Sequence, residues 1–121
     1  MAISIEQGFS VSVPVEITDG PAPAVPDTTT ALTNVTSDDP TKVNVVYPDP
    51  TPGVANPARS IRVDMSAGTA VGTGANFHAR YTSPYDGTIR NLSDLATATR
   101  APNAGTAAFG VPSPSFRTPP P

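Results

Sequence analysis

Hydrophobic and polar residues alternate most clearly in residues 9–17. Every odd position there is apolar, and every even position is polar or proline. A period of two residues is typical of a β-strand that buries one face. Because Pro14 has no backbone N–H to donate, we expect this strand at the edge of a sheet or in an arm that pairs on one side only.

Four further segments carry strand signals, and turn residues separate them. The clearest is residues 60–65, where Ile61, Val63 and Met65 alternate with polar neighbours. Short strands that recur at this spacing predict a small all-β sandwich. The four segments are residues 28–36, 43–47, 60–65 and 76–81.

Proline and glycine divide the chain into parts. Residues 1–20 are predicted to be an N-terminal strand or arm, residues 21–27 a stiff proline-rich linker, and residues 28–100 the β domain. Residues 91–100 fit either one short helix or two short extended pieces. Residues 101–121 are too rich in proline and glycine to form a core of their own, so we expect an extended tail.

Composition narrows the function classes. Sixteen prolines exclude long helices, and a net charge of −3 argues against binding to nucleic acid. Cysteine is absent, so disulfides and thiolate metal sites are excluded. No apolar run approaches the roughly 20 residues of a membrane span, and no basic, apolar leader opens the sequence. We expect no contact with nucleic acid or membrane.

Candidate chemistry is sparse. His78 is the only histidine, and alternation places it opposite Phe77, toward solvent or an interface. The glycine-rich residues 68–74 lack the Lys-Ser/Thr pair of a phosphate loop, and Asp38, Asp39 and Asp49 lack the spacing of a calcium loop. We therefore predict no enzymatic activity, no cofactor and no metal.

The six arginines are spaced singly along the sequence. Single arginines are usually solvated surface charges that add little stability. Arginine is also enriched, and lysine depleted, at protein interfaces, and this chain has only one lysine. Both interpretations stay open at this point.

Three short motifs resemble a known repeat. The run Ser37-Asp38-Asp39-Pro40-Thr41-Lys42-Val43, followed by residues 59–63 and Ala67-Gly68-Thr69-Ala70, is similar to the bacterial Ig-like group 2 repeat. The resemblance covers roughly residues 34–81. It implies that the β domain of residues 28–100 is a small immunoglobulin-like (Ig-like) β-sandwich, in which these motifs form turns and strands and carry no chemistry.

The resemblance implies two settings, bacterial surface adhesins and phage virions. We expect the virion setting, with the chain made in the host cytoplasm and placed on the capsid surface as a decoration (cement) protein. Its partners would be the major capsid protein and further copies of itself, as a trimer. The expected partner-binding residues form two apolar rows, one in each end segment of the chain. They are Phe9, Val11, Val13, Val15 and Ile17, together with Phe109, Val111 and Phe116.

The alternative is a phage tail or host-surface module that binds carbohydrate or a receptor. Its binding loops would be residues 48–57 and 83–87. Aromatic rings stack on sugars, so Tyr47, Tyr81 and Tyr85 are its candidate contacts.

Overall fold

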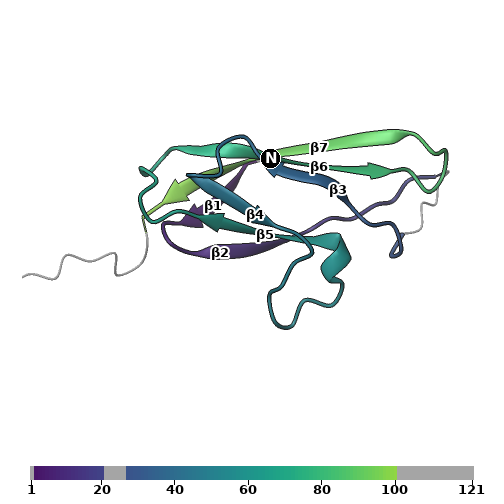
Figure 1. Cartoon of the computed structure of the whole chain (residues 1–121), viewed down its shortest axis with the longest axis horizontal. Coiled ribbons are helices and arrows are strands. Elements are labelled where there is room, and N and C mark those ends of the chain that lie inside the picture. The colour runs from purple at the N-terminus through teal and green to yellow at the C-terminus, as the bar shows by residue number, and fades with distance from the viewer. Residues whose placement is uncertain (1, 21–26, 101–121) are drawn as a thin grey trace, which may run out of the picture.

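Two β-sheets packed face to face make up the protein (Figure 1). The computed structural model describes residues 2–20 and 27–100. One sheet has the strand order β1-β7-β6-β3, and the other has the order β2-β5-β4. The predicted all-β sandwich is therefore confirmed. Its elements are β1 Ile3–Glu6, β2 Ser10–Pro14, β3 Thr33–Ser37, β4 Val43–Val46, the 3-10 turn η1 Pro57–Arg59, β5 Ser60–Met65, β6 Gly74–Thr82 and β7 Ile89–Thr99.

The strand order is that of an Ig-like sandwich. In such folds the second, fifth and fourth strands form one sheet, and the seventh, sixth and third form the other. The sheets β2-β5-β4 and β7-β6-β3 repeat this arrangement. β1 adds to the second sheet by pairing in parallel with the end of β7, from Ile3 opposite Ala96 to Glu6 opposite Thr99.

The N-terminal residues form strands of the sandwich, as the alternative of an edge strand expects, and not a separate arm. β1 belongs to one sheet and β2 to the other, so the chain crosses between the sheets within its first fourteen residues. Ile5 and Ile17 are each only 1% exposed. The domain thus comprises residues 2–20 together with 27–100. The predicted linker lies mostly, and the predicted tail entirely, outside the described residues.

The edge position of β2 explains how a strand tolerates Pro14. Met65 donates its N–H to the Phe9 carbonyl at 2.9 Å, and Val15 donates to the Arg59 carbonyl at 2.8 Å. Hydrogen bonding alternates along an antiparallel pair, so the odd-numbered residues of β2 bond to β5 and the even-numbered ones face away. The missing N–H of Pro14 therefore costs no hydrogen bond in the sheet.

Residues 91–100, which the sequence left open between helix and strand, belong almost entirely to β7. This strand pairs antiparallel with β6 from Gly74 opposite Thr97 to Thr82 opposite Ile89. Ala96 and Ala98 point inward and are fully buried. The segment reads weakly as a strand because its inward residues are mostly small, so the apolar alternation is faint.

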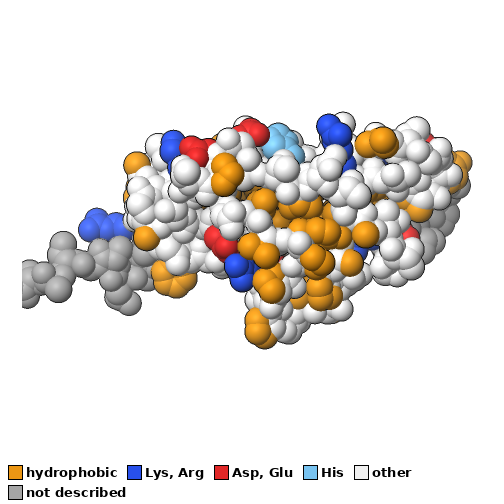
Figure 2. Space-filling view, in the orientation of Figure 1, with side chains coloured by type: hydrophobic (Ala, Val, Ile, Leu, Met, Phe, Trp, Pro, Cys, Tyr) orange, Lys and Arg blue, Asp and Glu red, His pale blue; other side chains and the backbone are white. Residues whose placement is uncertain are grey.

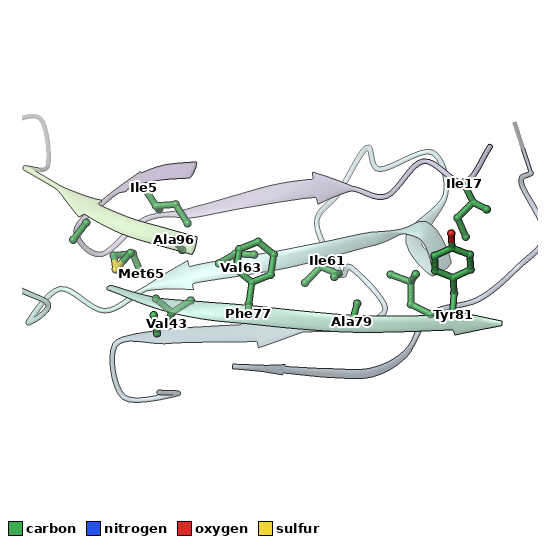
Figure 3. Packing of buried hydrophobic residues seen from close by; sticks show 13 residues of the cluster. Ile5, Ile17, Val43, Ile61, Val63, Met65, Phe77, Ala79, Tyr81 and Ala96 are labelled. Atoms are coloured by element: carbon green, nitrogen blue, oxygen red, sulfur yellow. The ribbon is translucent and has the colours of Figure 1, made fainter. Parts of the chain in front are cut away.

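The core fills the space between the sheets (Figure 3). Figure 3 shows Phe77 of β6 pointing toward Val63 of β5, while Ile17 and Tyr81 lie together at one end. Burial of such side chains is the main stabilising contribution in a chain without disulfides. The buried hydrophobic residues are Ile5, Ile17, Leu32, Val43, Ile61, Val63, Met65, Ala75, Phe77, Ala79, Tyr81, Ala96 and Ala98.

Candidate interaction surfaces

The turn between β6 and β7 exposes two large apolar side chains. Tyr85 is 64% exposed and Ile89 is 68% exposed. The turn is closed by Ser83, whose N–H donates to the Thr88 carbonyl at 2.7 Å. Gly87 supplies the positive φ of 73° that this reversal requires. We call Tyr85 and Ile89 the hairpin end.

Charged side chains hold the hairpin end in place. The Asp86 carboxylate accepts hydrogen bonds from the hydroxyl of Thr88 at 2.7 Å and from its N–H at 3.0 Å. These bonds lower the pKa of Asp86 below its ordinary value. Arg90 lies 3.3 Å from Asp86 and 3.3 Å from Asp19, so it ties the hairpin to the segment that follows β2. The apolar side chains are therefore displayed on a fixed turn.

Asp19 also receives the Tyr81 hydroxyl, at 3.0 and 3.2 Å from its two carboxylate oxygens. Burial and this contact with a carboxylate raise the pKa of Tyr81. The residues beyond β2 thus cross back over the end of β6 and β7. Asp19 therefore connects the segment after β2 to both strands of the opposite sheet.

The opposite end of the sandwich also exposes large apolar residues. Phe9, in the turn between β1 and β2, is 51% exposed, and Val71, between β5 and β6, is 57% exposed. The backbone joins these turns to the core, because Gly8 donates its N–H to the Met65 carbonyl at 3.0 Å and Gly72 to the Ala98 carbonyl at 2.9 Å. We call Phe9 and Val71 the turn end.

Apolar side chains are thus displayed at both ends of the long axis. The strands run along this axis, with the hairpin end at one extremity and the turn end at the other (Figure 1). Figure 2 also shows hydrophobic side chains over the middle of the face in view, beside β4 and the loop that follows it. Single exposed apolar residues are common on protein surfaces, so the two ends are candidate contact sites because of their position at the extremities.

A hollow of about 270 Å³ lies on the flank of the sandwich between β2 and β7. Along β7, the hollow lies between residues 96–99, which pair with β1, and Arg90, which contacts Asp19. Its lining combines core residues with residues from the two strands. The core residues are Ile61, Phe77 and Ala79; the others are Val13, Pro14, Val15, Glu16, Leu92, Ser93 and Asp94.

Arg59 is buried, although the sequence predicts the arginines to lie on the surface or at an interface. It is 5% exposed and not a solvated surface charge. One terminal nitrogen, Nη1, donates to the Asp27 carbonyl at 2.6 Å and lies 3.2 Å from its carboxylate, and Nη2 donates to the Val15 carbonyl at 2.9 Å. Arg59 therefore joins three stretches of chain that are distant in sequence.

Asp27 itself is fixed by the residues that follow it. Its carboxylate accepts hydrogen bonds from the Thr30 N–H at 2.9 Å and from the Thr29 hydroxyl at 3.0 Å. The hydrogen bonds from Thr30 are the main cause that lowers the pKa of Asp27 from 3.8 to about 2. Asp27 stays ionised beside Arg59 over most of the pH range.

The row predicted to bind a partner through β2 is mostly occupied within the domain. Ile17 is buried, and Val11, Val13 and Val15 pack against the core. These four side chains therefore already contribute to the core of the free domain, and their predicted role in binding a partner stays a prediction. Phe9 remains exposed. Phe109, Val111 and Phe116 lie outside the described residues.

Two of the three tyrosines proposed for sugar binding are structural. The Tyr47 hydroxyl donates to the Ala58 carbonyl at 2.6 Å and accepts the Leu32 N–H at 2.9 Å. Tyr81 is buried with Asp19 as its partner. Tyr85 is 64% exposed and Tyr47 is half-buried, so the predicted stacking role is wrong for the buried Tyr81.

The acidic residues considered for calcium are separated by the fold. Asp49 is buried and accepts hydrogen bonds from the Ser60 hydroxyl at 2.6 Å and the Thr51 N–H at 2.9 Å. Burial opposes its ionisation, but these bonds outweigh it and lower the pKa of Asp49. Asp39 caps the turn at Thr41. Within residues 2–20 and 27–100, no three His, Cys, Asp or Glu side chains are placed to hold a metal.

His78 lies on the outer surface of β6, as the alternation predicts. Its Nε2 is 2.9 Å from a carboxylate oxygen of Asp38, and both side chains are substantially exposed. Gly68 and Gly72 lie in the turns between β5 and β6, and Gly74 begins β6, so this segment is a β corner. No helix in the described part of the chain is long and apolar enough to cross a membrane.

Comparison with known proteins finds no matching family model, no matching curated protein and no matching solved structure. The Ig-like strand order therefore stands on its own geometry. The resemblance to the group 2 repeat stays a prediction from three short motifs.

Proposed function

We propose that this chain is a structural protein of a phage virion, a capsid decoration protein that stabilises contacts between major capsid proteins. The observation that carries the proposal is the pair of apolar ends. A module that displays fixed apolar side chains at both extremities can contact two neighbours at once. The virion setting itself comes from the sequence resemblance.

The use of the carboxylates supports a structural role. Asp27 and Asp49 accept several hydrogen bonds each from hydroxyl and backbone groups of nearby loops. Lowered pKa values keep these groups ionised, whereas a general acid at neutral pH needs a raised pKa. These carboxylates serve the fold, which agrees with a non-enzymatic module.

The apolar ends give the proposal its mechanism. Each end would bury its exposed pair of side chains against a coat subunit, and both contacts would have to break before the subunits separate. Two weak contacts joined by a rigid body bind more tightly than either contact alone. A trimer of the chain would multiply the contacts further.

Charge substitutions at the two ends test this proposal. We expect Tyr85→Asp with Ile89→Asp, and separately Phe9→Asp with Val71→Asp, to lower occupancy on purified capsids at least about tenfold, because a charge must be desolvated at each contact. Occupancy is measured by sedimenting the particles and quantifying bound protein. Leu95→Asp is the matched control, since Leu95 is exposed on β7 between the two ends. Wild-type occupancy of both double variants would contradict the proposal.

The exposed Tyr85 ring favours one second candidate, a tail or host-surface module that binds carbohydrate. The ring lies next to Asp86, and a carboxylate beside an aromatic face is a common sugar contact. Glycan-array binding by the wild-type protein that Tyr85→Ala abolishes would support this function over decoration. Tyr47→Phe is the control, because its hydroxyl lies inside the fold.

A further inference from the structure

β7 has a partner along only part of one edge. β1 pairs with residues 96–99 and stops there. Residues 89–95 have β6 on one side, and no other strand of the described chain lies on the other. An edge of this kind presents unpaired backbone groups to any extended segment that fits.

The register shows which groups face this open edge. Ser83 donates its N–H to the Thr88 carbonyl, and Ala98 donates to the Thr73 carbonyl at 2.8 Å, so the even-numbered residues of β7 bond to β6. The odd-numbered residues therefore direct their N–H and C=O groups outward, and of these the Leu95 N–H already donates to the Asp94 carboxylate at 2.9 Å. Asn91 and Ser93 are the central pair.

The open edge borders the hollow between β2 and β7. Its volume of about 270 Å³ far exceeds the roughly 30 Å³ that one water occupies in the liquid. Phe77, Ala79, Ile61 and Leu92 give it an apolar lining, and Glu16 and Asp94 also line it. Apolar side chains fit this space better than charged ones.

β1 shows what the same edge accepts. It is an extended segment of four residues in which Ile3 and Ile5 alternate with Ser4 and Glu6. Ile5 is buried in the core, and Ile3 packs against it. A second segment with alternating apolar residues would continue this line along β7.

We propose that residues 107–111 of this same chain form that segment and pair with the free edge of β7. Ala107, Phe109 and Val111 alternate with the small residues Ala108 and Gly110, and none carries a charge. The five residues match the five of β7 from Asn91 to Leu95. Phe109 would enter the hollow.

The distance permits this docking within one molecule. From Thr99 back to the level of Leu95 is four residues, or about 13 Å along a strand. The seven residues 100–106 span up to about 23 Å. Pro102 and Asn103 are residues that reverse a chain readily. A tethered segment competes at an effective concentration near the millimolar range, which favours the same molecule over another copy.

This inference concerns the free protein and does not rest on the proposed virion function. In this proposal Phe109 fills the hollow, and residues 107–111 cover the edge of β7. It also means that part of the tail is engaged before any capsid contact forms.

Amide hydrogen exchange of the full chain, followed by NMR, tests the proposal. We expect the Asn91 and Ser93 amides to exchange about tenfold or more slowly in the wild type than in Phe109→Asp, because a paired amide exchanges only on opening. Phe116→Asp is the matched control and should exchange as the wild type does. The Leu92 amide, which bonds to β6, reports in each variant that the sheet is intact.

Two results would overturn the proposal. Equal exchange at Asn91 and Ser93 in the wild type and in Phe109→Asp would show that residues 107–111 do not pair with β7. Protection that rises with protein concentration, together with a dimer mass by light scattering, would show that another copy supplies the segment. Wild-type capsid occupancy bears only on the proposed function, so the two failures are distinguishable.

Discussion

The two halves of β7 face opposite surroundings within one strand. Near its end, β1 covers the edge and Ala96 and Ala98 are fully buried. Near its start, the edge is open and Ile89 is exposed. The covered half carries small inward residues because β1, β6 and the core converge there. In the other half, among the described residues, β7 pairs with β6 alone, and the side chain of Ile89 projects from the outer face of the sheet.

This contrast places stability and contact in different parts of one element. Substitutions in the covered half should act on folding, and substitutions in the open half should act on binding. The hairpin end continues the open half. The predictions below test this division, beginning with the largest expected change in the free energy of unfolding.

Gly74→Ala should be the most damaging substitution. Gly74 pairs opposite Thr97 in the covered half, and a Cβ atom on it would lie 1.7 Å from the Ala96 carbonyl oxygen. Because the obstacle is backbone, the two strands must separate. We expect a loss of about 4 kcal/mol or more, which is enough to unfold much of a marginally stable domain. Urea unfolding followed by circular dichroism measures it.

Gly68→Ala is the matched control for this change. Its nearest neighbour would be the Ser66 hydroxyl oxygen at 4.0 Å, and its φ is not in the left-handed region. We expect a change within about 0.5 kcal/mol. A cost at Gly74 no larger than at Gly68 would show that the covered half is not tightly packed.

Arg59→Met should have the next largest effect, because Arg59 joins Val15, just after β2, to Asp27. The variant keeps an apolar stem but leaves the Val15 and Asp27 carbonyls without their donors. We expect a loss of about 3 kcal/mol in the free energy of unfolding. Arg62→Met is the control, since the partly exposed pair of Arg62 with Asp64 should be worth about 0.5 kcal/mol. Equal losses would mean that Arg59 does not join these segments.

The same contact makes stability depend on acid. The pKa of Asp27 is about 2 in the folded protein and near 3.8 when unperturbed, so its stabilising contribution is complete above about pH 4. As the pH falls through 3.8 toward 2, the unfolded state takes up a proton before the folded state does, and the melting temperature should fall. Asp27→Asn should start lower and change less across this interval. A parallel pH profile for the variant would contradict the assignment.

The sequence predicts where the strands lie better than it predicts which strands pair. Alternation located the strand within residues 9–17 and those at 60–65 and 76–81, because burial of one face imposes a period of two wherever a strand lies. It could not show that Val13 pairs opposite Ile61, since register depends on contacts far apart in the chain. For the same reason, alternation left residues 1–20 open between a strand at a sheet edge and an arm.

The buried polar contacts were harder to predict for the same reason. The run Asp27-Thr28-Thr29-Thr30 carries a local signal, because aspartate often accepts hydrogen bonds from residues two and three positions ahead. The burial of Arg59 has no such signal, since it requires three distant segments to meet. The hydroxyl partners of Tyr47 and Tyr81 are also distant in sequence, so no local pattern predicts them.

The smallest predicted effect lies in the open half. Ile89→Ser should change the free energy of unfolding by less than about 0.5 kcal/mol, because the side chain is exposed and gains nothing from burial in the free protein. The same substitution at Ile5, which is buried beneath the covered half, should cost about 3 kcal/mol and sets the scale. Urea midpoints of both variants, measured side by side, give the comparison. A loss above about 1.5 kcal/mol at Ile89 would mean that another part of the chain packs on the hairpin end. The hairpin end would then not be a free contact surface, and the division between a half of β7 for folding and a half for contact would fail.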